Sequence, residues 1–98
     1  MEKLVRDNII NIILSSWRNP SYRQVFWQEK LDFMLLKLIE ESKELQKDKN
    51  IEEFADVLEV IDALKKEFWF TDDEIEKTRK QKYDKNWWFD RGYILEIN

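Results

Sequence analysis

Two long helical patterns separated by a short polar turn constrain this chain more than any other feature. Apolar residues recur at three- and four-residue intervals from about residue 24 to 46 and again from about 51 to 69. Asp48, Lys49 and Asn50 form the turn, and a link this short makes the two helices an antiparallel pair in contact. The expected apolar stripes are Leu31, Met34, Leu35, Leu38 and Leu45, with Ile39 at one margin, and then Phe54, Val57, Leu58, Ile61, Leu64 and Phe68.

The rest of the chain predicts two further helices. One spans about residues 6 to 17 and is broken by Asn19-Pro20-Ser21. Thr71 and Glu74 have the spacing of a capping box, which predicts a helix from about residue 72 to 83. With one glycine and one proline in 98 residues, the chain lacks the turn residues that strand-rich folds need. We expect one all-α domain over residues 1–98: an antiparallel bundle of about four helices with a short irregular or extended C-terminal tail.

Composition excludes several kinds of chemistry. The chain has no cysteine and no histidine, so it has neither disulfides nor thiolate sites, and no imidazole base. Any metal must therefore be bound through oxygen, which favours Mg²⁺, Mn²⁺ or Ca²⁺. A net charge of −4 argues against nucleic acid as a partner. No apolar run approaches the ~20 residues of a membrane span, and no signal pattern opens the chain, so we expect a cytoplasmic protein without a membrane partner.

Four acidic residues form two pairs with the same spacing on the two central helices. Glu41 and Glu44 lie on the first helix, and Glu53 and Asp56 lie on the second. At ~100° per residue, the members of each pair lie about 80° and about 140° from the centre of the apolar stripe, in the same rotational sense. Such pairs are common on solvated helix faces, and Glu53 also has the position of a capping-box residue. The second interpretation is that all four carboxylates converge and bind a hard cation such as Mg²⁺.

The segments that carry these acids resemble a known enzyme family. KLIEESKELQ followed by IEEFADVLEVIDAL is similar to the MazG-like all-α nucleoside triphosphate pyrophosphohydrolases, whose hallmark is an ExxE pair followed by an ExxD pair. The opening KLVRDNII and the ending Lys82…NWWFDRGYIL resemble the phosphoribosyl-ATP pyrophosphohydrolase-like branch, so the resemblance covers nearly the whole chain. Ile10 replaces the family's proline, and Trp87-Trp88 replaces its Gly-Gly pair.

The resemblance implies a hydrolase that cleaves nucleoside triphosphates between the α and β phosphates. The products are a nucleoside monophosphate and pyrophosphate, as in house-cleaning enzymes. Glu41, Glu44, Glu53 and Asp56 would bind Mg²⁺, with Mn²⁺ as an alternative. Glu41 or Glu44 would accept the proton of the attacking water.

A triphosphate also needs cationic partners, and the chain offers them near both ends. The candidates for binding substrate are Lys3, Arg6, Arg79, Lys82 and Trp88. Each cation has a second interpretation as a solubilising surface charge, although Arg6 and Lys82 also match the family. Trp87 and Trp88 either stack on a base or lie in a subunit interface, where tryptophan is enriched. The resemblance further implies a homodimer or a homotetramer.

The departures from the family pattern are compatible with a second function. The lost glycines and the interval of eight residues between Glu44 and Glu53, shorter than usual in the family, favour a non-catalytic helical module. Such a module would keep the fold and bind a nucleotide or a partner protein without turnover.

Overall fold

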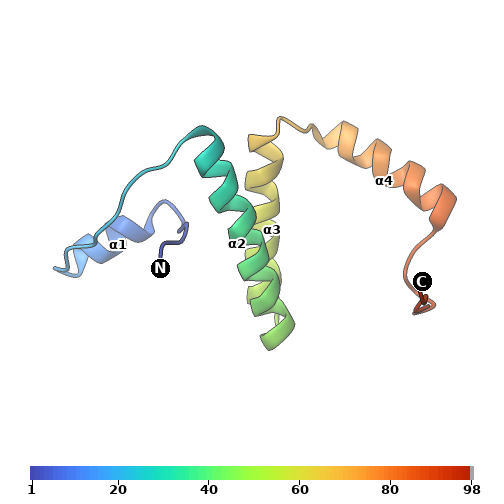
Figure 1. The fold of residues 1–98 in the computed structure, drawn as a ribbon, viewed down its shortest axis with the longest axis horizontal. Coiled ribbons are helices and arrows are strands. Elements are labelled where there is room, and N and C mark those ends of the chain that lie inside the picture. The colour runs from blue at the N-terminus through green and yellow to red at the C-terminus, as the bar shows by residue number, and fades with distance from the viewer. Residues whose placement is uncertain (98) are drawn as a thin grey trace. The chain divides into compact units, whose positions relative to one another are not determined.

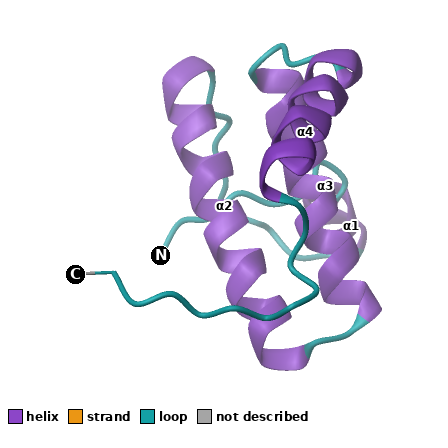
Figure 2. Cartoon of the chain, turned by 90° about the vertical axis from the view of Figure 1, so that its right-hand side faces the viewer, coloured by secondary structure: helices purple, strands orange, loops and turns teal. Residues whose placement is uncertain are grey.

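The computed structural model describes residues 1–97 and is all-helical over that range (Figure 1). Its helices are α1 (Ile9–Ser15), α2 (Trp27–Asp48), α3 (Ile51–Glu67) and α4 (Asp72–Asn86). No strand occurs among these residues, and the C-terminal tail is irregular (Figure 2). The expected all-α fold of about four helices is confirmed. The chain forms two compact units, Met1–Phe68 and a second that begins at Trp69.

The helix ends differ from those predicted by the apolar pattern, and local backbone chemistry accounts for three of the differences. α1 is shorter than expected because the Ser15 and Ser16 hydroxyls donate to carbonyls of its last turn and Trp17 has a left-handed φ of 62°. α3 ends two residues early, before Trp69 at φ 63°, and α4 continues three residues further, up to Trp87 at φ 68°. α2 begins at Trp27 instead of residue 24 and continues two residues beyond its expected end.

Two side-chain caps define where α3 and α4 begin. Asn50 is the N-cap of α3, and its side-chain oxygen accepts a hydrogen bond from the backbone N–H of Glu53 at 2.9 Å. Thr71 and Glu74 form the complete capping box expected at the start of α4. The cap of α3 thus uses the backbone of Glu53, which leaves the carboxylate of Glu53 for other contacts.

Within the first unit, α2 and α3 lie side by side and form an antiparallel hairpin (Figure 1). Lys49 makes the tight turn possible because it takes the left-handed conformation, with φ at 50°, directly after α2. The contact buries Met34 of α2 and Leu64 of α3, which are 4% and 6% exposed. These are the two buried hydrophobic residues of the described chain, so the hairpin has a small core.

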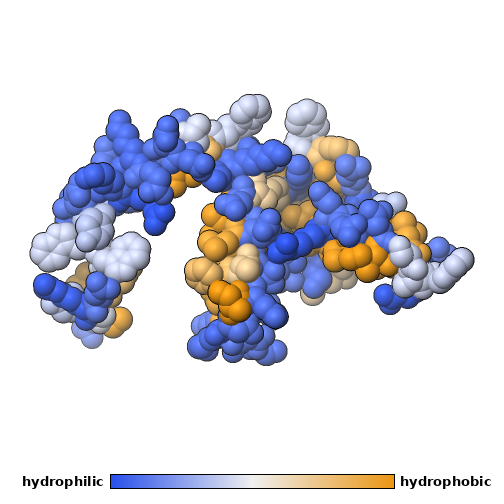
Figure 3. Space-filling view, turned by 180° about the vertical axis from the view of Figure 1, so that it is seen from behind, coloured by the Kyte–Doolittle hydropathy of each residue, from blue (hydrophilic) through white to orange (hydrophobic). Residues whose placement is uncertain are grey.

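The packed stripe is narrower than the apolar pattern predicts. Six of the expected stripe residues are between 40% and 53% exposed: Leu35 and Ile39 on α2, and Phe54, Leu58, Ile61 and Phe68 at and beyond α3. Val57, which was expected in the stripe, and Val60, which was not, are half-buried on α3. We call these six residues the apolar face of the hairpin. Hydrophobic side chains gathered on the hairpin are visible in Figure 3.

The second unit consists of α4 and the tail that follows it. α4 is polar on all sides and has no buried residue. At its C-terminal end the rings of Tyr83 and Trp88 lie 6.4 Å apart, and those of Trp88 and Phe89 lie 5.9 Å apart. The guanidinium of Arg91 lies 5.5 Å from the centre of the Trp87 ring. The tail is therefore organised by aromatic contacts rather than by strand pairing.

Candidate metal centre

The hairpin has two different sides, and helix geometry explains why. Leu35 of α2 and Leu58 of α3 each follow an inward-facing residue by one position, about 100° round the helix. Glu41 and Asp56 are offset from the packed stripe in the opposite sense. Because antiparallel helices place equal offsets on the same side of the pair, the apolar face lies on one side and the acids on the other.

Carboxylates from both helices meet on the acidic side. Oxygen atoms of Glu41, Glu53 and Asp56 all lie within 4.8 Å of one another, and all three side chains are half-buried. A second group, Glu44, Asp48 and Glu53, meets the same criterion, but Glu44 and Asp48 are exposed. Glu53 belongs to both groups. We call these five residues the acidic cluster.

The acidic cluster differs in one respect from the set predicted from the sequence. The four predicted carboxylates lie on one side of the hairpin, but they form two overlapping groups joined by Glu53 rather than one set. Asp48 was missed because the sequence pattern assigns it to the turn. α2 in fact extends to Asp48, one turn beyond Glu44, so the two residues share a helix face.

Crowding of negative charge affects Glu53 most. Desolvation raises the pKa of Glu53 above its usual value of 4.5, and four nearby negative charges raise it further. In order of effect, these charges belong to Asp56, Glu44, Asp48 and Glu41. The ionised form of Glu53 is therefore disfavoured in the fold, and a cation placed among these groups would relieve the repulsion.

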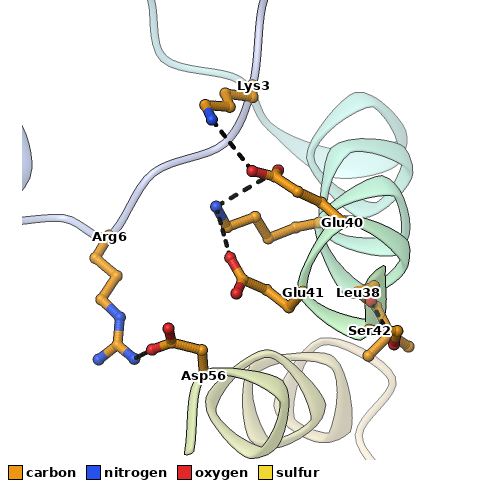
Figure 4. Close-up of polar contacts among 8 residues, drawn as sticks. Lys3, Arg6, Leu38, Glu40, Glu41, Ser42 and Asp56 are labelled. Carbon is orange, nitrogen blue, oxygen red and sulfur yellow. Dashed lines mark hydrogen bonds and ion pairs between the residues drawn. The ribbon is translucent and has the colours of Figure 1, made fainter. Parts of the chain in front are cut away.

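Basic side chains already contact part of the acidic side (Figure 4). Arg6 Nη2 lies 2.9 Å from Asp56 Oδ1, and Lys37 Nζ lies 3.1 Å from Glu41 Oε1. Lys3 Nζ lies 3.2 Å from Glu40 Oε1, and Lys37 also approaches Glu40 at 3.6 Å. The sequence did not predict these ion pairs.

Glu40 is more enclosed than its position on the helical wheel suggests, which is almost directly away from the core. Its side chain is only 33% exposed, since Lys3 and Lys37 cover it. Desolvation raises the pKa of Glu40, but the pairs with Lys3 and Lys37 outweigh it and hold the pKa below its usual value. Glu40 is thus an ion-pair partner at the edge of the acidic cluster.

The chemistry of the donor set fits a hard divalent cation. Three carboxylates from two helices supply oxygen ligands, and the chain has no cysteine thiolate and no histidine imidazole to compete with them. Mg²⁺ commonly binds through a few carboxylates and keeps further positions for water and substrate phosphates. Glu41, Glu53 and Asp56 are the residues that would bind it, with Glu44 and Asp48 beside them.

The remaining predicted substrate residues belong to the second unit. Arg79 lies on α4, where its guanidinium pairs with Glu76 at 2.9 Å. Lys82 is exposed on the same helix. Trp88 lies just beyond it, in a groove that Tyr83 and Arg91 also line. Their part in substrate binding stays a prediction.

Trp17, Trp27 and Trp69, which lie at or near helix ends, are each at least 86% exposed in the single chain. None of the three belongs to the core. None of the helices in the described range combines the length and apolarity needed to cross a bilayer. Comparison with protein-family models, with curated proteins and with solved structures finds no match to this chain.

Proposed function

We propose that this protein is a Mg²⁺-dependent nucleoside triphosphate pyrophosphohydrolase that releases a nucleoside monophosphate and pyrophosphate. The observation that carries the proposal is the meeting of Glu41, Glu53 and Asp56 from two helices. Bringing three carboxylates within 4.8 Å is unfavourable without a cation, as the raised pKa of Glu53 indicates. The resemblance of both acid pairs and both chain ends to the MazG-like family supports the same function. Since the proposed substrates are free nucleotides, we also propose a cytoplasmic location.

The residues of the acidic cluster would have different roles in the reaction. A bound Mg²⁺ would supply charge neutralisation at the phosphates and acidify an attacking water. Glu41, with 12% of its side chain exposed, is the most enclosed ligand candidate among those with an ion pair. Glu44 is exposed, as suits a base that exchanges protons with solvent. Lys3 and Arg6, which belong to the same unit as the acidic cluster, would contribute positive charge toward the triphosphate, and Arg79, Lys82 and Trp88 stay candidates from the sequence resemblance.

A panel of canonical and modified nucleoside triphosphates, incubated with Mg²⁺, tests the activity through release of pyrophosphate. We expect release from at least one member and a loss of about 100-fold or more in the Glu41→Gln variant. Glu59→Gln is the matched control, because Glu59 is an exposed carboxylate of α3 outside the acidic cluster. Absence of release from every substrate, or equal rates in the parent and Glu41→Gln, would refute the proposal.

A non-catalytic module that binds a nucleotide or a partner protein is the second candidate. It is favoured by the ion pairs Arg6–Asp56 and Lys37–Glu41, which partly neutralise the acids without a metal. Binding of a triphosphate analogue without pyrophosphate release would support this function instead.

We further propose that the apolar face pairs with the same face of a second copy. Two buried hydrophobic residues are a small core for a chain of this length, whereas six large apolar residues share one exposed side of the hairpin. Two hairpins related by a two-fold axis would bury both apolar faces and form four packed helices. The acids lie on the opposite side of each hairpin and would stay accessible.

A further inference from the structure

The N-terminal arm, residues 1–6, crosses the acidic side of the hairpin and contacts both of its helices (Figure 4). Lys3 pairs with Glu40 of α2, and Arg6 pairs with Asp56 of α3. The arm and the hairpin belong to the same unit. Two positive charges, three residues apart in the chain, are thus placed on carboxylates that lie sixteen residues apart in the sequence.

Arg6 and a divalent cation need the same carboxylate. Asp56 is one of the three ligand candidates, and Arg6 Nη2 lies 2.9 Å from its Oδ1. A carboxylate that accepts this charged hydrogen bond is partly neutralised and binds a cation less strongly. Lys37 forms a similar ion pair with Glu41, but the backbone of Lys37 is fixed within α2, whereas Arg6 lies on the arm.

The pairs made by the arm are suited to exchange. The side chains of Lys3 and Arg6 are each 58% exposed, and Asp56 is 42% exposed. Exposed ion pairs of this kind are weak, because water screens them and long side chains lose entropy in forming them. A divalent cation has twice the charge of a guanidinium and can contact several carboxylates at once.

We propose that the N-terminal arm is a displaceable cationic strap, in which Arg6 holds Asp56 until a divalent cation replaces it. The inference rests on the metal centre of the proposed function and adds a second state of Arg6. Once released from Asp56, the guanidinium is free to bind a triphosphate. Arg6 therefore opposes the binding of Mg²⁺ alone but favours the binding of the nucleotide.

The strap is tested by one substitution that should strengthen the binding of Mg²⁺ alone and weaken the binding of the Mg²⁺-triphosphate. Arg6→Gln should raise the affinity of the full chain for Mg²⁺ alone by about two- to fivefold, the range of one exposed ion pair, in calorimetric titrations at constant ionic strength. The same variant should raise KM for the Mg²⁺-triphosphate. Arg18→Gln is the matched control, because Arg18 carries the same charge in the same unit and contacts Ser16 rather than a carboxylate.

A second measurement follows the arm itself. Addition of Mg²⁺ to the parent should shift the backbone amide resonances of residues 2–8 in two-dimensional NMR spectra. Arg6→Gln should already show the shifted positions without metal. A residue that only stabilised the fold would not change Mg²⁺ affinity and KM in opposite directions.

The strap proposal is wrong if Arg6→Gln binds Mg²⁺ with the same affinity as the parent or a lower one. It is also wrong if Mg²⁺ does not bind to the parent, or binds without shifting the amide resonances of the arm. The proposed hydrolysis fails separately, when Mg²⁺ binds but no triphosphate releases pyrophosphate. In that case the Mg²⁺ titration and the arm resonances still decide whether the strap exists.

Discussion

Truncation of two side chains at the centre of the apolar face tests the proposed dimer. Leu58 and Ile61 are 47% and 44% exposed in the single chain, so about half of each side chain remains to be buried by a partner. Full burial of a leucine or isoleucine is worth about 1.5–3 kcal/mol, so truncating the exposed half to alanine should cost about 0.5–1 kcal/mol per side chain. A two-fold dimer contains four such side chains, which gives about 2–4 kcal/mol and a dimer Kd weakened about 30- to 700-fold.

Sedimentation equilibrium over a dilution series, with circular dichroism at each concentration, measures this change. Ile12→Ala is the matched control, because Ile12 is 55% exposed on α1, outside the hairpin and its apolar face. The parent should be dimeric and helical, and the Leu58→Ala/Ile61→Ala variant should dissociate at higher concentrations. A helical parent that stays monomeric at every concentration would refute the reasoning, as would a dimer that Ile12→Ala weakens more than the double substitution does.

Three further predictions concern the acidic cluster and the helix caps. Because the pKa of Glu53 is raised in the fold, this residue costs stability as pH rises from its usual value of 4.5 through the folded-state pKa. Glu53→Gln should therefore raise the melting temperature at pH 7 in the absence of metal, with the gain vanishing toward pH 4, and Glu59→Gln should show no such pH-dependent gain. Asn50→Ala should lower the free energy of unfolding by about 1 kcal/mol in urea titrations, whereas Asn50→Gly should cost only a few tenths, because glycine is tolerated as an N-cap. Thr71→Ala should accelerate hydrogen exchange of amides 72–75 by about fivefold, the equivalent of about 1 kcal/mol, and equal rates in both proteins would show that the capping box does not stabilise α4.

Local chemistry explains why the starts of α3 and α4 were predictable. Asn50 and Thr71 satisfy N–H groups only three residues away, so their roles depend on spacing alone. The helix ends were less predictable, because four tryptophans, Trp17, Trp27, Trp69 and Trp87, have left-handed φ values that no tryptophan preference indicates. Three of them lie at or just beyond a helix C-terminus, and Trp27 begins α2.

On the acidic side of the hairpin, the positions of the carboxylates were predictable from the sequence, but their ion pairs were not. Successive helical residues are about 100° apart, and the turn between α2 and α3 has two residues. Glu41, Glu53 and Asp56 therefore lie on one side of the antiparallel pair, regardless of how the rest of the chain packs. The pairing of Arg6 with Asp56 spans 50 positions and could not be read from any local pattern. It needs the path of the arm across both helices.

The sequence by itself determined that this chain is helical, where α3 and α4 begin, and that its acids share one side of the hairpin. These properties follow from periodicity and short-range hydrogen bonds. Only the tertiary structure decided which apolar residues are buried, since two helices can cover a narrow stripe of each other and leave Leu58 and Ile61 half-exposed. It also decided which cations lie against the acids, because those contacts depend on how distant segments pack.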